Sequence, residues 1–113
     1  MKLLATDMDG TFLRDDKSYS DEFNDLYKQM LKQGIQFVIA SGNQYEALVC
    51  KFDEEIKNDL YYLCENGTKI VYRGDVIYKH CLETDDYQHA LNILKEDEEC
   101  MLVVSGVKHA YIL

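Results

Sequence analysis

The sequence predicts an α/β protein, with three parallel strands that alternate with helices and a smaller α+β segment after them. The strand pattern comes from three apolar stretches, which amphipathic stretches separate: residues 2–6, 35–40 and 60–64. Such alternation is typical of βαβ units around a parallel sheet with right-handed crossovers. After Gly67 the pattern changes to two short apolar stretches close together, as in a hairpin. We therefore expect a βαβαβ unit over residues 1–66 and a ββαββ unit over residues 67–113.

The first helix is expected after a loop of residues 8–19. Ser20 suits the N-cap position, and Asp21 and Glu22 add the negative charge that a helix N-terminus favours. Apolar and aromatic side chains then recur at helical spacing: Phe23, Leu26, Tyr27, Met30 and Leu31. Gly34 readily adopts the left-handed conformation that commonly ends a helix, so we expect the helix to stop there.

The remaining elements are predicted from apolar periodicity and turn residues. A second helix is expected over residues 44–52, and the acidic stretch 53–59 can either prolong this helix or follow it. The later elements are a hairpin, a helix capped by Thr84 and two strands joined at Ser105-Gly106: residues 69–72, 76–80, 85–96, 100–104 and 109–113.

The composition predicts a cytoplasmic protein with no nucleic-acid and no membrane partner. The formal net charge of −9 opposes binding to polyanions such as nucleic acids. No apolar stretch approaches the length of a membrane span, and Asp7 interrupts the first one before it reaches the length of a signal-peptide core. The four cysteines form no Cys-x-x-Cys pair, so we expect buried thiols in a reducing compartment: Cys50, Cys64, Cys81 and Cys100.

Two carboxylates follow the first strand, in the run Asp7-Met8-Asp9-Gly10-Thr11. A parallel strand delivers its last residues to the carboxyl edge of the sheet, where ligands bind in open α/β folds. Mg²⁺ is commonly held there by one or two carboxylates and a substrate phosphate, and Asp can attack phosphorus as a nucleophile. Asp-Gly is equally a common turn signal, so the pattern alone leaves both interpretations open.

Polar residues also follow the second and third strands. Gly42 and Asn43, which follow Ser41, are expected to open a helix whose free N–H groups favour an anion, although capping of that helix by Ser or Asn explains the same motif. Asn66 lies at the carboxyl end of the third strand and can either face the cleft or form an Asn-Gly turn between the two units. Both alternatives stay open for each motif.

Taken together, these motifs resemble those of the haloacid dehalogenase superfamily, in particular its Cof-like capped subgroup. Residues 7–13 resemble the first motif of that superfamily, and residues 35–43 resemble the second. Residues 63–68, Leu-Cys-Glu-Asn-Gly-Thr, are similar to the Glu-Asn-Gly-Ala segment of the subgroup. The resemblance covers the whole chain and implies a partial Rossmannoid core over residues 1–66, followed by the start of a cap.

The resemblance implies a Mg²⁺-dependent phosphatase that acts on a small phosphorylated metabolite through an aspartyl-phosphate. Asp7 would be the nucleophile, and Asp9 would protonate the leaving alcohol and later activate water. The two residues would also hold Mg²⁺, through the side chain of Asp7 and the main-chain oxygen of Asp9. The phosphate would be bound by four further residues: Thr11, Ser41, Gly42 and Asn43.

The sequence departs from the family in lacking its third motif, with a Lys, and its fourth, an acidic cluster. We therefore expect the amino-terminal portion of a phosphatase, incomplete or inactive alone, whether a natural truncation, an expressed fragment or a degenerate relative. A non-catalytic remnant or interaction module is the main alternative. A phosphoacceptor receiver-like domain is less favoured, because the third strand ends in Glu65-Asn66 where a receiver has an acceptor Asp.

The resemblance also implies that the first strand is central in the complete core. Without its neighbour, residues 2–6 would expose an apolar edge. Exposed edges invite pairing with another chain. We therefore expect self-association or pairing with a complementary fragment.

Overall fold

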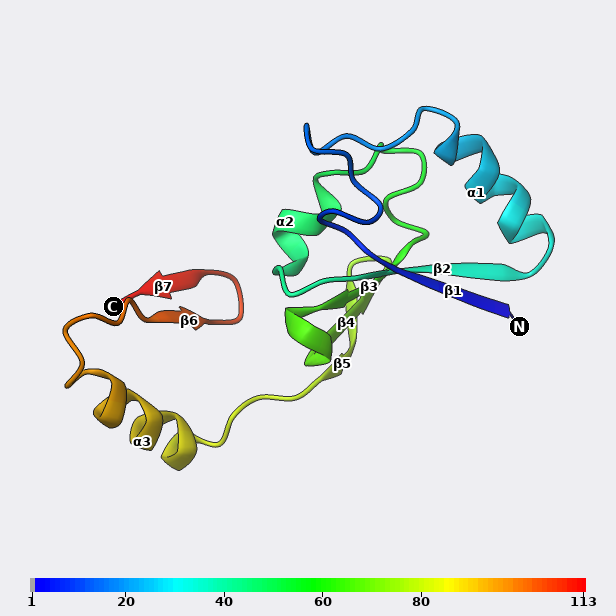
Figure 1. Ribbon diagram of the computed structural model, residues 1–113. Coiled ribbons are helices and arrows are strands. Elements are labelled where there is room, and N and C mark those ends of the chain that lie inside the picture. Colours follow the sequence, from blue (N-terminus) through cyan, green and yellow to red (C-terminus); the bar gives the residue numbers. More distant parts are fainter. Residues whose placement is uncertain (1) are drawn as a thin grey trace. The chain divides into compact units, whose positions relative to one another are not determined.

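A computed structural model describes residues 2–113 and divides the chain into two compact units, Met1–Lys79 and His80–Leu113 (Figure 1). The first unit contains a five-stranded sheet with the strands in sequence order. Its strands are β1 (Lys2–Asp7), β2 (Ile35–Ala40), β3 (Tyr61–Cys64), β4 (Lys69–Tyr72) and β5 (Asp75–Lys79). The first three are parallel and the last two add as an antiparallel hairpin. The α/β class and the three parallel strands are confirmed.

Two helices connect the parallel strands, α1 (Phe23–Lys32) and α2 (Tyr45–Val49). Each helix buries aromatic or aliphatic side chains in the core: Phe23 and Tyr27 from α1, and Leu48 from α2. The Tyr27 hydroxyl donates a hydrogen bond to the Asp59 carbonyl at 2.7 Å, so its polar end is satisfied inside the protein. A fully buried side chain of this size stabilises the fold by about 1.5–3 kcal/mol.

One face of the sheet carries the core. The strand registers bring the buried side chains of Ile39, Tyr62 and Val71 side by side across β2, β3 and β4. On the opposite face, the rings of Tyr61 and Tyr72 stack across β3 and β4, with centroids 4.1 Å apart and planes at 7°. The alternation of buried and half-buried residues along β2, β3 and β4 follows directly from the period of two.

The second helix is shorter than expected, and the acidic stretch does not prolong it. Residues 50–59 form turns, with Phe52 and Ile56 buried among them. The Asp53 carboxylate accepts hydrogen bonds from the Tyr19 hydroxyl at 3.0 Å and the Asn24 side-chain amide at 2.6 Å. These bonds tie the segment to the residues before and within α1, which explains why the helix does not continue.

Two expected helix caps are also corrected. The first helix begins at Phe23, with Glu22 in the N-cap position, whereas Ser20 lies in the preceding turn and its carbonyl accepts the Phe23 N–H at 2.9 Å. In the second unit, Thr84 is the first residue of the helix and Glu83 is its N-cap. By contrast, Gly34 follows the first helix with a φ of +71°, as its left-handed role requires.

The second unit consists of one helix and one hairpin: α3 (Thr84–Leu94), β6 (Val103–Ser105) and β7 (Ala110–Ile112). The two strands pair antiparallel, as expected, and are shorter than the sequence indicates. The hairpin β4–β5 continues the sheet of the first unit, so the compact units separate at Lys79 and His80. The division of core from cap at residues 66 and 67 stays a prediction. The antiparallel hairpin stands where a receiver-like domain needs further βα units, so that alternative is wrong.

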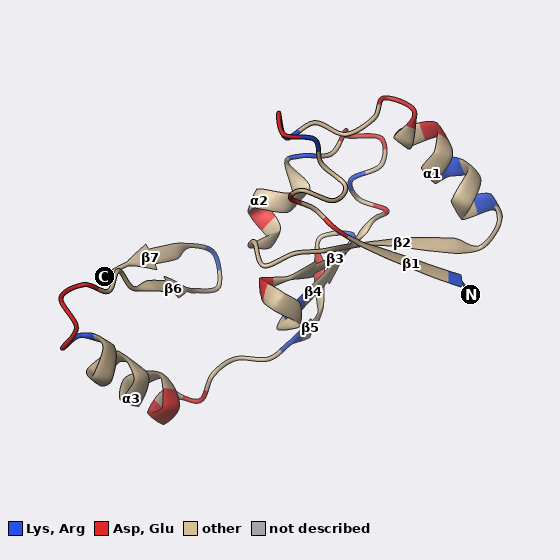
Figure 2. Cartoon of the chain, in the orientation of Figure 1, with Lys and Arg blue, Asp and Glu red and all other residues tan. Residues whose placement is uncertain are grey.

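Charged residues are spread over both units (Figure 2). Lys and Arg are scattered along the chain, with acidic residues between them (Figure 2). In residues 2–113 no helix has the length and apolar character needed to cross a membrane.

The expectation of four buried cysteines is wrong for three of them. Only Cys64 is buried, on the core face of β3, whereas Cys50, Cys81 and Cys100 are exposed. Burial raises the pKa of the Cys64 thiol to about 11. Cysteine spacing excludes a metal motif but does not say which face of an element a thiol occupies.

We predict that iodoacetamide at pH 8 modifies Cys50 in the folded protein and leaves Cys64 unmodified. With a pKa of about 11, roughly one thousandth of the Cys64 thiol is ionised at this pH, and its burial blocks access as well. Peptide mass spectrometry measures the modification at each site, and the same reaction in urea is the control, in which both thiols react. Equal modification of the two in the folded state would contradict the burial of Cys64.

We predict that the chain self-associates through β1. This strand lies at one end of the sheet, and its Leu3 and Leu4 side chains are 63% and 45% exposed on opposite faces. Lysine on an edge strand opposes pairing, so Leu3→Lys should raise the dissociation constant about tenfold, or ~1.4 kcal/mol. Leu26→Lys is the matched control, because Leu26 is similarly exposed on α1. Sedimentation equilibrium at micromolar concentration measures the change, and a monomeric wild-type chain would contradict it.

Candidate functional site

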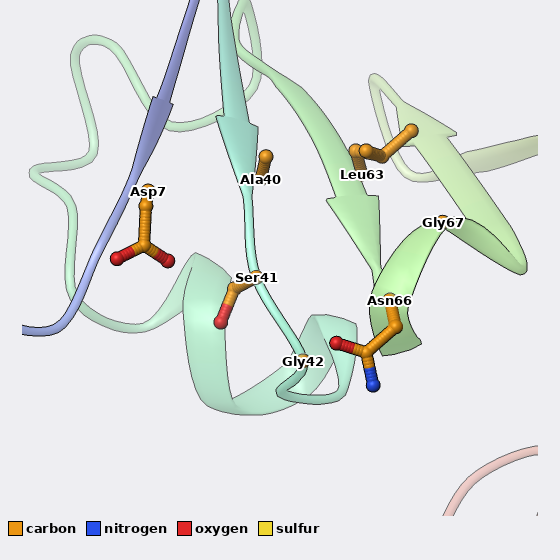
Figure 3. A pocket seen from close by; sticks show the side chains of 7 residues that line it. All are labelled: Asp7, Ala40, Ser41, Gly42, Leu63, Asn66 and Gly67. Carbon is orange, nitrogen blue, oxygen red and sulfur yellow. The ribbon is translucent and has the colours of Figure 1, made fainter.

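The carboxyl ends of β1, β2 and β3 meet at one edge of the sheet and form a cavity. The registers place Asp7 beside Ala40 and Ala40 beside Leu63, so the three strands end almost level. The cavity has a volume of about 240 Å³ and is lined by Asp7, Ala40, Ser41, Gly42, Leu63, Asn66 and Gly67. Figure 3 shows the Asp7 carboxylate and the Ser41 hydroxyl on neighbouring strand ends, with the Asn66 side chain next to Gly42.

Two buried side chains anchor the loop that follows β1. Met8 and Leu13 lie in the core, and the Met8 carbonyl accepts the Leu13 N–H at 2.9 Å. Gly10 makes the intervening turn with a φ of +76°, a conformation that other residues adopt at a cost. The segment between the anchors therefore bulges outward, with Asp9 and Thr11 exposed at the end of the strand.

The first carboxylate is exposed and has a local hydrogen-bond partner. The Thr11 hydroxyl donates to Asp7 Oδ2 at 3.2 Å. Thr11 does not line the cavity itself; its hydroxyl orients a carboxylate that does. This contact ties Thr11 to the end of β1, and the expected contact of Thr11 with phosphate stays a prediction.

The second carboxylate lies between two donors from different parts of the chain. Lys17 Nζ donates to Asp9 Oδ1 at 2.9 Å, and Asn43 Nδ2 donates to Asp9 Oδ2 at 3.4 Å. The hydrogen bond and the charge of Lys17 lower the pKa of Asp9. Asp9 and Asn43 do not line the cavity. Asn43 directly follows Ser41 and Gly42, which do line it, and its side chain donates to Asp9. Nothing in the sequence points to Lys17, because a lysine in a polar loop carries no periodic or spacing signal.

The loop after β2 crosses to the end of β3 through its backbone. The Ser41 carbonyl accepts the Asn66 N–H at 3.2 Å, and the Asn43 carbonyl accepts the Glu65 N–H at 3.1 Å. The Ser41 hydroxyl accepts the Asn43 N–H at 3.1 Å, so it closes a local turn. The expectation that Gly42 and Asn43 open the helix is corrected, because α2 begins at Tyr45 with Gln44 as its N-cap.

The turn after β3 is left-handed at consecutive residues. Glu65, Asn66 and Gly67 have φ angles of +52°, +57° and +95°. Asn and Gly accept this conformation readily, whereas Glu pays a cost in backbone strain. Both interpretations of Asn66 therefore hold geometrically: it forms the turn and it lines the cavity.

Gly42 fits closely against this turn. A Cβ atom at Gly42 would lie 3.0 Å from Asn66 Oδ1, tighter than an ordinary van der Waals contact. Because Gly42 has no side chain, the loop after β2 can lie close to the turn after β3. Of the seven expected site residues, Asp7, Ser41, Gly42 and Asn66 line the cavity, and Asp9, Thr11 and Asn43 adjoin it through hydrogen bonds.

The donor set suits a hard cation only in part. The side chain of Asp7 is exposed at the cavity, and carboxylates are ligands that Mg²⁺ prefers. Within residues 2–113, no three His, Cys, Asp or Glu side chains lie close enough together to hold a metal ion. The residues present thus supply part of a Mg²⁺ site, which substrate phosphate and water or another segment would have to complete.

Comparisons with known proteins agree with one another. A family described as haloacid dehalogenase-like hydrolase matches residues 4–113. A curated relative is 41% identical over 114 residues, covering 100% of this chain and 42% of its own length: the 5-amino-6-(5-phospho-D-ribitylamino)uracil phosphatase YbjI of Escherichia coli. A second, YcsE of Bacillus subtilis, carries the same phosphatase name and is 30% identical over 90 residues, or 78% of this chain and 35% of its own length.

Solved structures show the same likeness. The crystal structure of SMU.1108c from Streptococcus mutans superposes with a TM-score of 0.91 at 31% identity, covering 98% of this chain and 42% of the other. A haloacid dehalogenase-like hydrolase from B. subtilis superposes with a TM-score of 0.85 at 24% identity, covering 99% of this chain and 39% of the other, which bears on the fold alone. This chain thus spans about two fifths of the proteins that it matches.

We predict that Gly42→Ala displaces the Asn66 side chain and destabilises the fold by about 1 kcal/mol, because the new methyl group overpacks the turn. Urea unfolding measures the stability, and the NMR signals of the Asn66 side-chain amide report the displacement. The matched control is the same substitution in an Asn66→Ala background, where the contact is gone and the cost should shrink. An equal cost in both backgrounds would show that Gly42 and Asn66 are not in contact.

Proposed function

This chain belongs to the haloacid dehalogenase-like hydrolases, and from that premise we propose that it carries the nucleophile-bearing part of a Mg²⁺-dependent phosphatase. The observation that supports this most directly is the exposed Asp7 carboxylate in a cavity with Ser41 and Asn66. Its proposed substrate is a small phosphorylated metabolite. The assignment of roles to individual residues is part of the proposal.

In the first step, an Asp7 carboxylate oxygen attacks the phosphorus atom, and the bond from phosphorus to the ester oxygen breaks. The leaving alkoxide takes a proton from Asp9, so an aspartyl-phosphate on Asp7 and a neutral alcohol result. Thr11 holds the attacking carboxylate in place, since its hydroxyl donates to Asp7 Oδ2. Ser41 would donate a hydrogen bond to a phosphoryl oxygen from the neighbouring strand end.

In the second step, Asp9 takes a proton from water, and the water oxygen attacks the phosphorus atom of the aspartyl-phosphate. The bond from phosphorus to Asp7 breaks, which releases inorganic phosphate and restores the carboxylate. The Lys17 contact lowers the pKa of Asp9, so it favours the ionised form that begins this step and opposes the protonated form that the first step needs.

A divalent cation fits this proposal through the side chain of Asp7 and the main-chain oxygen of Asp9. When bound, Mg²⁺ neutralises charge on the phosphoryl oxygens, which is the main requirement of phosphoryl transfer. The chain has a net charge of −9, so positive charge at the phosphate must come from such local sources.

The substrate class follows from the site and the relatives together. The cavity of about 240 Å³ has room for a phosphoryl group and the start of its leaving group. YbjI and YcsE are named for a phosphorylated ribitylaminouracil, so a phosphorylated sugar alcohol is a reasonable first substrate to assay. Sugar phosphates, nucleotides and flavin phosphates remain competing candidates.

Location and partners are proposed from charge and thiols. All four cysteines are free thiols, as is typical of a reducing compartment, and we propose a cytoplasmic location. The net charge of −9 opposes nucleic acids and anionic membrane surfaces as partners. A second copy of the chain or a complementary fragment at β1 is the proposed protein partner.

A non-catalytic interaction module is the second candidate function. It is favoured by one observation: no three metal-ligating side chains converge within residues 2–113. The chain also spans only 42% of the length of YbjI. The activity of the complete relatives applies to this chain only as a proposal. A direct assay separates the two candidate functions.

We expect the chain alone to be incomplete, so turnover requires that self-association, substrate and water complete the Mg²⁺ site. A chain completed in this way should hydrolyse p-nitrophenyl phosphate only in the presence of Mg²⁺. Asp7→Asn should reduce the rate to background because it removes the nucleophile, and Asp9→Asn should reduce kcat by roughly 10²–10⁴-fold because it removes the acid and base. Asp15→Asn is the matched control, since Asp15 is an exposed carboxylate of the same loop. Wild-type turnover no faster than that of Asp7→Asn would refute catalysis by this chain and favour the interaction module.

A further inference from the structure

Lys17 lies in a tight turn of the loop after β1. The Arg14 N–H donates to the Ser18 carbonyl at 2.8 Å, and the Lys17 N–H donates to the Arg14 carbonyl at 2.9 Å. Side chains brace the same turn: Asp16 Oδ1 accepts the Ser18 N–H at 3.0 Å, and Arg14 Nη1 donates to the Tyr19 carbonyl at 3.0 Å. Lys17 is therefore held at a defined point beside the site.

The backbone at Lys17 is strained. Its φ of +66° is in the left-handed region, where turns usually have Gly. A lysine there costs stability that a glycine would not. Such strain persists where the surroundings hold it, and it is found preferentially at functional sites.

The ion pair that this lysine forms does not explain its presence through stability. The side chains of Lys17 and Asp9 are 61% and 48% exposed, and exposed ion pairs contribute little to the free energy of unfolding. Lys28 Nζ and Glu55 Oε2 form a comparable exposed ion pair, 2.8 Å apart, and neither residue lines the cavity. What distinguishes Lys17 is its partner, the carboxylate two residues after Asp7.

We propose that Lys17 is a positioning residue that fixes the orientation of the Asp9 carboxylate. The Lys17 ammonium group, in the turn after β1, donates to Asp9 Oδ1 at 2.9 Å. The Asn43 amide, in the loop after β2, donates to Asp9 Oδ2 at 3.4 Å. The two donors approach different oxygens, so together they restrict rotation of the carboxylate in a way that neither does alone. The kinetic consequence of this rests on the proposed function, whereas the contact itself does not.

The contact is tested first without turnover, from the NMR signals of the Asn43 side-chain amide. Lys17→Met should shift these signals, because release of Asp9 Oδ1 lets the carboxylate rotate away from Asn43. Lys28→Met should leave them unchanged, since it removes an equally exposed ion pair outside the site. Unchanged Asn43 signals in Lys17→Met would overturn the proposal, whether or not the chain is active.

Turnover of p-nitrophenyl phosphate tests the consequence. Lys17→Met should lower kcat by about tenfold to a hundredfold with little change in KM, as misplacement of a catalytic group does. Lys17→Arg should recover most of the rate, because Arg can donate to the same oxygen, and Lys28→Met should match the wild type. In a chain that hydrolyses the substrate, a wild-type kcat in Lys17→Met would overturn the proposal.

Lys17→Gly separates positioning from folding. Glycine relieves the strained φ, so the midpoint of thermal unfolding should not fall, while kcat should fall as in Lys17→Met. A lower midpoint together with a retained kcat would show a purely structural role. If the wild-type chain shows no turnover, the proposed catalytic function fails, and the Asn43 signals still decide the role of Lys17.

Discussion

The parallel pairing of β1 with β2 over their whole length is the constraint on which the site depends. The register from Lys2 with Ile35 to Asp7 with Ala40 ends both strands at the same level. Asp7 at the end of β1 and Ser41 just after β2 therefore meet at one edge of the sheet. The burial of Met8 then fixes the direction in which the chain leaves β1, which places the second carboxylate outside the cavity but next to it.

Much of this arrangement can be read from the sequence, because it follows from strand ends. The apolar runs and the helical spacing between them predict three parallel strands, and parallel strands share a carboxyl edge. That reasoning predicts that Asp7 and Ser41 lie near one another and leaves Asn66 open between the cleft and a turn. All three residues line one cavity. The chemical roles of these residues depend on substrate and metal, and they remain predictions.

The features that could not be predicted depend on contacts distant in sequence. The length of α2 is limited by Asp53, whose partners Tyr19 and Asn24 precede it by many residues. Lys17 reaches Asp9 through a left-handed turn for which Gly is the usual signal, so its sequence gives no indication of the contact. The exposure of Cys50 likewise depends on which side of a short helical segment faces the core.

The stacked rings of Tyr61 and Tyr72 give this molecule a built-in optical label. The chain has nine tyrosines and no tryptophan, so no indole absorption masks the phenol signals. Two phenol rings with centroids 4.1 Å apart and nearly parallel planes should couple their electronic transitions and produce a near-ultraviolet circular dichroism band tied to the pairing of β3 with β4. Separation of these strands would thus be visible in solution without any added dye.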